Sequence, residues 1–138
     1  MKRFLNSVVS GVTFASLLWL GTGSRAQASC SNASLKGTYA ASCTGTVGLP
    51  GSPVQQAIVG IVSFDGEGGL SVKATLMQDG GPAVPLNVTG TYTVNPDCTG
   101  SDVLAGSFHY DIAVFADKAG FFSVETDPGT QVTCVKQK

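Results

Sequence analysis

The stretch GTYTVNPDCTGS, residues 90–101, holds a strand pattern, a turn and a cysteine within twelve residues. The segment 86–95 is rich in Val, Thr, Leu and Tyr, which favours a β-strand. The residues 95–100, NPDCTG, are typical of a turn, because Pro presets φ and Gly permits a positive φ. Cys98 therefore lies at a turn. We interpret it as a disulfide partner, because a nucleophilic thiol would need a base and His109 is the single histidine of the chain.

The same pattern of strands and tight turns extends along the chain. One helical turn is expected at 32–37, capped by Asn32 and ended by Gly37, and no window of ten residues after it has helical spacing. Seven charged residues fall in the expected turns: Asp65, Glu67, Asp79, Asp97, Asp117, Lys118 and Asp127. This spacing is typical of an all-β barrel or sandwich. We expect eight strands, at 37–47, 54–65, 70–78, 86–95, 101–107, 109–116, 120–126 and 130–136.

Residues 1–28 are typical of a secretory signal peptide. Lys2 and Arg3 precede an apolar stretch at 8–20, and Ala26-Gln27-Ala28 fits a cleavage site. The apolar stretch is shorter than the roughly 20 residues that span a bilayer as a helix. We therefore predict a signal peptide at 1–28, cleavage near Ala28 and Ser29, and a single domain at 29–138. The mature chain is predicted to be secreted or periplasmic, with no transmembrane segment.

Removal of residues 1–28 leaves 110 residues with five lysines, nine acidic residues and no arginine, a net charge of −4. Such a chain has no basic patch for nucleic acid, so we expect no nucleic-acid partner. The four cysteines are far apart in sequence, which disfavours a zinc site, and we expect no metal and no cofactor. The acids at 65–69, DGEGG, are too few for a calcium loop and indicate a hairpin.

Two expected strands are apolar on both faces. In AIVGIVSF, residues 57–64, Val59 and Ile61 point to one side while Ile58 and Val62 point to the other. The segment 110–116, YDIAVFA, behaves in the same way. A small barrel needs only one apolar face for each strand, so the second face predicts a homo-oligomer.

The segments 30–39 (CSNASLKGTY), 64–69 (FDGEGG) and 90–101 resemble a group of small exported bacterial proteins with an allene oxide cyclase-like barrel. This barrel is similar in shape to dirigent and lipocalin barrels. The resemblance implies an eight-stranded antiparallel up-and-down barrel, calycin-like and stapled by disulfides. Allene oxide cyclases and dirigent proteins bind apolar or phenolic intermediates and steer their cyclisation or coupling. No position matches their functional polar residues, so no catalytic residue is carried over.

Three functions follow as hypotheses. The leading one is a non-enzymatic barrel that binds a small apolar molecule or a protein partner, since a barrel of eight strands can hold one small ligand. The alternatives are a cyclase or isomerase that works through its pocket, and a structural, self-associating envelope protein. His109 and Asp111 share a strand face, and we interpret them as a surface pair. The candidate ligand-binding residues are aromatic: Tyr39, Phe64, Tyr92, Phe108 and Tyr110.

Closure of an up-and-down barrel places the first strand beside the last. Cys43 and Cys134 lie in those two strands, so closure can bring them within disulfide distance. Cys30 and Cys98 then remain, and both can reach one end of the barrel. We predict the pairs Cys43–Cys134 and Cys30–Cys98.

Overall fold

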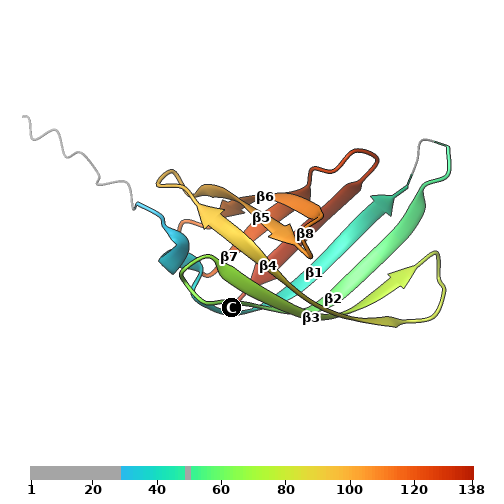
Figure 1. Cartoon of the computed structure of the whole chain (residues 1–138), viewed down its shortest axis with the longest axis horizontal. Helices are drawn as coiled ribbons and strands as arrows, with labels where there is room; N and C mark the ends of the chain where they lie inside the picture. Colours follow the sequence, from blue (N-terminus) through green and yellow to red (C-terminus); the bar gives the residue numbers. More distant parts are fainter. Residues whose placement is uncertain (1–28, 49–50) are drawn as a thin grey trace, which may run out of the picture.

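The computed structural model describes residues 29–48 and 51–138, so the predicted signal peptide at 1–28 lies outside the described residues. Every strand pairs antiparallel with its neighbour in sequence, and the first pairs with the last, which closes the barrel (Figure 1). The predicted eight-stranded up-and-down barrel is confirmed, and strand ends agree within three residues. A 3-10 helix, η1 (Asn32–Leu35), precedes the strands β1 (Gly37–Val47), β2 (Val54–Phe64), β3 (Gly69–Gln78), β4 (Val84–Val94), β5 (Thr99–Leu104), β6 (Phe108–Val114), β7 (Gly120–Glu125) and β8 (Gln131–Gln137).

Alternation of side chains along each strand separates the inside of the barrel from its surface. In β1, Tyr39, Ala41 and Cys43 are buried and the residues between them are exposed. In β8, Val132, Cys134 and Lys136 point inward in the same way. This two-residue period is the one that a strand with a single buried face requires.

Large aromatic side chains fill one end of the barrel, which we call the closed end. It is the end at which β1 begins, and Leu35 of η1 is fully buried there. Phe64 makes edge-on ring contacts with Tyr39, Tyr92 and Phe121, at centroid separations between 4.8 and 5.6 Å. Such contacts stabilise a core by about 0.5–1.5 kcal/mol each beyond their burial. The closed end is therefore a packed core.

Asn32 ties η1 to the closed end. Its side-chain Oδ1 accepts a hydrogen bond from the Val94 backbone N–H at 2.8 Å, and its carbonyl accepts one from the Tyr92 hydroxyl at 3.0 Å. The expectation that Asn32 caps the helical turn was wrong, because Ser31 occupies the capping position. The Asn32 amide oxygen is instead bound by β4, and its amide nitrogen donates to the Glu67 carbonyl of the β2–β3 turn, so this residue fixes η1 across the closed end.

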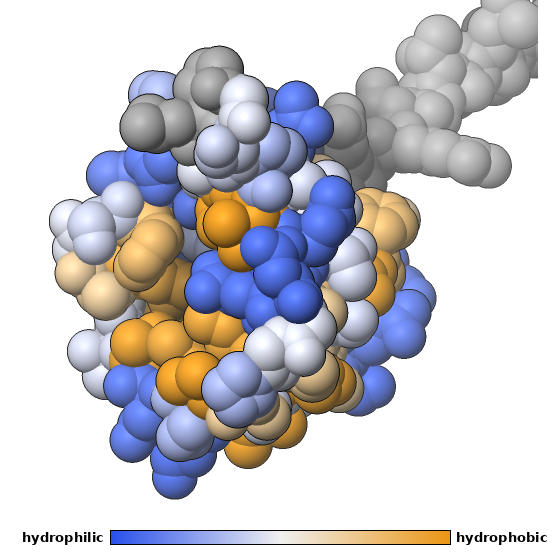
Figure 2. All heavy atoms as spheres, turned by 90° about the vertical axis from the view of Figure 1, so that its right-hand side faces the viewer, coloured by the Kyte–Doolittle hydropathy of each residue, from blue (hydrophilic) through white to orange (hydrophobic). Residues whose placement is uncertain are grey.

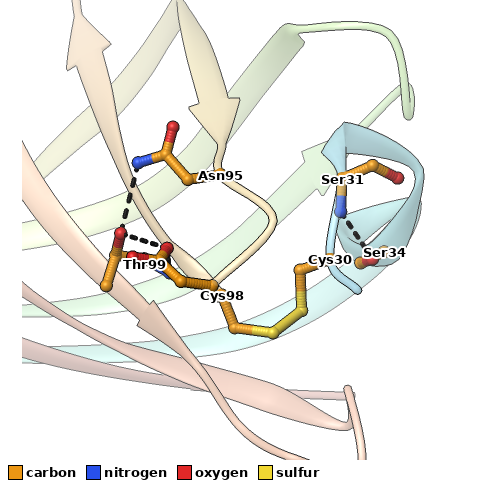
Figure 3. Close-up of a disulfide and its surroundings, with 7 residues drawn as sticks. Cys30, Ser31, Ser34, Asn95, Cys98 and Thr99 are labelled. Atoms are coloured by element: carbon orange, nitrogen blue, oxygen red, sulfur yellow. Dashed lines mark hydrogen bonds between the residues drawn. A yellow bond between two sulfur atoms is a disulfide. The ribbon is translucent and has the colours of Figure 1, made fainter. Parts of the chain in front are cut away.

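The disulfide Cys30–Cys98 joins the segment before η1 to the β4–β5 turn, as predicted (Figure 3). In that turn Asp97 Oδ1 accepts hydrogen bonds from the backbone N–H and the hydroxyl of Thr99. The positive φ of the turn falls on Cys98, at 70°, and not on Gly100 as expected. Gly100 lies inside β5, where a Cβ would collide with the backbone carbonyl of Thr93.

The second predicted disulfide, Cys43–Cys134, lies inside the barrel and is also present. The two cysteines are directly opposite each other in the β1–β8 ladder, with their Cα atoms 4.0 Å apart. Directly opposed residues in a pair without ladder hydrogen bonds approach most closely in antiparallel sheets, which suits a disulfide. The bond therefore crosslinks the two strands that close the barrel.

The β2–β3 turn is the hairpin that the acids at 65–69 indicated. Asp65 Oδ1 accepts hydrogen bonds from the backbone N–H groups of Glu67, Gly68 and Gly69, and these bonds lower the pKa of Asp65. Over the described ranges, no group of three or more potential metal ligands comes together, and no helix has the length and apolarity to cross a membrane.

Removal of the inner disulfide should destabilise the barrel without changing its fold. We expect Cys43→Ala/Cys134→Ala to lower the free energy of unfolding by about 2–5 kcal/mol, because the bond restricts the unfolded chain across 91 residues. Urea unfolding followed by circular dichroism measures this change. Cys30→Ala/Cys98→Ala is the matched variant, because it leaves the Cys43–Cys134 crosslink between β1 and β8 in place. An unchanged urea midpoint in the first variant would contradict the prediction.

Candidate functional site

A cavity of about 260 Å³ opens at the end of the barrel opposite η1, which we call the open end. There the hairpins β1–β2 and β3–β4 extend beyond the shorter strands β5 to β8 (Figure 1). Figure 2 views this side and shows hydrophobic side chains between hydrophilic ones. The wall is mainly apolar: Ala41, Val47, Ile58, Val62, Val72, Ala74, Leu76, Leu86, Val88, Leu104 and Phe108, together with the disulfide Cys43–Cys134.

Small residues on neighbouring strands explain why the interior is hollow here. Ala41, Gly60 and Ala74 are in register across β1, β2 and β3, on the inner face of the wall. Gly60 cannot be larger, because a Cβ there would collide with the backbone of β3. A row without large side chains leaves volume that the closed-end aromatics do not reach.

Polar groups enter the cavity at two levels. Gln56 and Gln78 line it near the mouth, where their amides lie 3.4 Å apart. Deeper along β6, β7 and β8, the side chains of Tyr110, Glu125 and Lys136 also line it. Polar groups converging inside a mainly apolar pocket are typical of a binding or catalytic site.

Lys136 is a charged residue in the barrel interior, with its side chain 7% exposed. Its Nζ donates a hydrogen bond to Ser123 Oγ at 2.8 Å and lies 3.9 Å from Asp102 Oδ2. The same Nζ sits 4.6 Å from the centre of the Phe121 ring, a cation–π distance. Lys136 thus links β8, β7 and β5 across the interior.

Burial and pairing act against each other on this ion pair. Burial lowers the pKa of Lys136, and the Asp102 carboxylate raises it. Burial raises the pKa of Asp102, and the Lys136 ammonium lowers it. Asp102 Oδ1 is buried and has no hydrogen-bond partner among residues 29–48 and 51–138, so Lys136 is the main compensation for this carboxylate.

Glu125 and Tyr110 form a second polar pair. The Tyr110 hydroxyl donates to Glu125 Oε2 at 3.4 Å, and both residues are buried. Burial raises the pKa of Glu125, and the hydrogen bond from Tyr110 lowers it. Burial and the nearby carboxylate of Glu125 raise the pKa of Tyr110, so its hydroxyl stays protonated.

The structure divides the five predicted ligand-binding aromatics between the two ends. Phe108 and Tyr110 line the cavity. The other three, Tyr39, Phe64 and Tyr92, belong to the closed-end core and line no part of the cavity. Their strand positions near η1 explain this, because inward-facing residues at that level meet the packed aromatics.

His109 does not pair with Asp111. His109 Nδ1 lies 2.7 Å from Asp127 Oδ1, and the His109 backbone N–H donates to Asp127 Oδ2. These contacts lower the pKa of Asp127. The interpretation of a surface position holds, since the His109 side chain is half exposed and Asp111 is exposed. The partner was wrong because Asp127, in the β7–β8 turn, reaches back over the first residues of β6.

The buried charges Asp102, Glu125 and Lys136 were missed in the sequence. One signal was present for Lys136: it lies two positions after Cys134, and residues two apart in a strand share a face. Because the structure shows Cys134 facing the interior, Lys136 must face it too, but the predicted pairing of Cys43 with Cys134 did not itself give that direction. Asp102 and Glu125 lie in expected strands, and their inward direction depends on the exact start of β5 and β7.

No known family model, curated protein or solved structure matches this chain. The resemblance to the allene oxide cyclase-like group stays a prediction.

Loss of the lysine should leave a buried, uncompensated carboxylate. We expect Lys136→Met to lower the free energy of unfolding at pH 7 by about 3–5 kcal/mol, as is typical when one partner of a buried pair is removed. Lys136→Met/Asp102→Leu, which replaces both charges by apolar groups, should recover most of that loss. Urea unfolding of both variants measures the difference, and equal losses would contradict the prediction.

The same variant predicts a pH dependence. Without Lys136 the pKa of Asp102 rises further, so the folded state binds a proton more tightly than the unfolded state does. The loss of stability in Lys136→Met should then shrink as the pH falls from 7 towards the unperturbed Asp pKa of 3.8. Unfolding curves of the variant and the wild type at several pH values measure this gap. A gap that is constant with pH would place the penalty outside Asp102.

Proposed function

We propose that this protein is an exported binding protein for a small, mostly apolar molecule that carries one polar group. The observation that carries the proposal is the open-end cavity, whose apolar wall meets Tyr110, Glu125 and Lys136 at one place. A cavity of about 260 Å³ is close to the lower end of the range for ligand pockets, about 300–1,000 Å³. It suits a single ring or a short chain.

Export is supported by the two disulfides, since such bonds persist in oxidising compartments. With the predicted signal peptide, they favour a secreted or periplasmic location. The ligand would then be a molecule met outside the cytoplasm, and the disulfide in the cavity wall would stay oxidised while it binds.

Binding can be tested with 2-phenylethanol, a neutral probe with one ring and one polar group. We expect titration calorimetry to show one site, and Ala74→Phe to abolish binding because the added ring occupies the cavity. Thr75→Phe is the control, since Thr75 is exposed on the outer face of β3, next to Ala74 in sequence. Val88→Phe, which adds a ring from the cavity-lining face of the neighbouring strand β4, tests the same volume if Ala74→Phe does not fold. Unchanged binding in both cavity variants would overturn this location of the site.

A cyclase or isomerase is a second candidate, and the Tyr110–Glu125 pair favours it. A carboxyl whose pKa is raised by burial is suited to give or take a proton, and Glu125 lines a mainly apolar pocket. An enzyme of this kind would return its bound molecule rearranged, whereas a binding protein would release it unchanged. Mass spectrometry and NMR of the recovered ligand separate the two.

Self-association is supported by the outer surface of four adjacent strands. The outward-facing residues of β7, β8, β1 and β2 include no charged side chain. Val59 is 63% exposed and Phe122 57% exposed, and Ser42 and Val135 connect them across the ladders. An exposed, uncharged sheet surface that carries large apolar side chains among Ser, Thr and Gln favours contact with a second copy of the chain.

A charge on that surface should prevent the association. We expect the wild type to sediment as an oligomer at micromolar concentration, and Phe122→Lys to shift it to the monomer because the lysine would be buried in the interface. Ser101→Lys, on the exposed face of β5, is the control and should leave the oligomer intact. A monomeric wild type would contradict the proposal.

A further inference from the structure

The charges inside the barrel do not balance. Asp102, Glu125 and Lys136 are each at most 5% exposed when the whole residue is counted. They are two acids and one base. Lys136 is engaged by Ser123 and Asp102, as described above. Glu125 makes no ion pair among the described residues, because the salt bridges there join Lys136 with Asp102 and His109 with Asp127.

No positively charged side chain of the described residues pairs with Glu125. From β6 it faces the Tyr110 hydroxyl, which stays protonated. From the β7–β8 turn the Asp127 carboxylate acts on it and raises its pKa further. His109 is bound to Asp127 and points outward. Lys136 of β8 lies over the Tyr110 ring at 5.6 Å, but its Nζ donates to Ser123 and pairs with Asp102, not with Glu125. Glu125 therefore lines the cavity with the Tyr110 hydroxyl as its hydrogen-bond partner and with no cation paired to it among the described residues.

We propose that the ligand is a small primary amine, whose protonated nitrogen pairs with Glu125 while its apolar body fills the cavity. This inference rests on the proposed function and adds the chemical class of the polar group. A buried carboxylate is compensated best by a cation with which it makes a charge-assisted hydrogen bond. The aromatic residues Tyr110 and Phe108 also line the cavity, and a cation is attracted to the face of an aromatic ring.

The alternatives fit the same groups less well. A carboxylate ligand would add a third negative charge to an interior with one lysine, and that lysine already donates to Ser123 and lies beside Asp102. A neutral alcohol could accept or donate a hydrogen bond but would leave the charge of Glu125 uncompensated. The net charge of −4 on residues 29–138 also favours the approach of a cation.

Three probes with the same ring and similar length test the inference: 2-phenylethylamine, 2-phenylethanol and 3-phenylpropanoate. We expect calorimetry at pH 7 to show the amine binding at least tenfold more tightly than the alcohol, and the carboxylate binding most weakly. Glu125→Gln should abolish the preference for the amine while 2-phenylethanol still binds. Asp111→Asn removes an exposed acid from the outer face of β6 and should change none of these affinities.

The outcomes separate the two proposals. If the alcohol or the carboxylate binds as tightly as the amine, the amine inference is overturned and the binding function stands. If none of the three probes binds, both fail. If Glu125→Gln keeps the preference, the amine is held elsewhere and the assignment to Glu125 is wrong.

A second measurement needs no variant. The side-chain carboxyl carbon of Glu125, followed by NMR, should titrate above the ordinary Glu pKa in the free protein. Saturating 2-phenylethylamine should lower that pKa, because the bound cation favours the ionised form. A pKa that is unchanged when the amine binds would overturn the pairing.

Discussion

Pairing between β1 and β8 is the constraint on which the rest of this structure depends. It turns a meander into a closed wall, and closure leaves none of the strands β1 to β8 with an unpaired edge. Cys43 and Cys134 lie opposite each other at that seam and crosslink it covalently. Closure also encloses an interior, in which side chains from β5, β7 and β8 meet. The ion pair of Asp102 with Lys136 exists only because of that closure.

The two ends of the barrel use the same inward positions for different purposes. Towards η1 these positions carry rings, and the rings pack edge to face around Phe64. Towards the open end, inward positions of β1, β2 and β3 carry the small residues Ala41, Gly60 and Ala74, and the interior there holds the cavity. The packed closed end and the cavity at the open end therefore both result from the change from large to small inward-facing side chains along the strands. The packed end holds the strands in the positions that keep the other end open.

Strand order, strand ends and both disulfides could be predicted because they depend on local patterns and on the topology of a closed meander. The alternation of Tyr39, Ala41 and Cys43 in β1 is visible in the sequence, and so is the turn around Cys98. The level of each residue along the barrel axis could not be predicted, and this decided the roles of the aromatics. Tyr92 and Tyr110 have similar strand settings, yet one lies in the closed-end core and the other lines the cavity. The contact between Asp102 and Lys136 joins strands that are not neighbours, which no periodicity along the chain records.

Antiparallel pairing between neighbours in sequence has a consequence for the order of folding. Each hairpin from β1–β2 to β7–β8 joins strands separated by a short turn, so these contacts are local and close quickly. The seam is the exception, because its partners are 91 residues apart at the disulfide. During vectorial synthesis, one edge of β1 therefore stays unpaired until β8 has been made. Unpaired edge strands of this kind readily join other chains. Oxidation of Cys43 with Cys134 can follow only the arrival of the last strand, so it marks the end of folding and makes the late, high-contact-order step difficult to reverse.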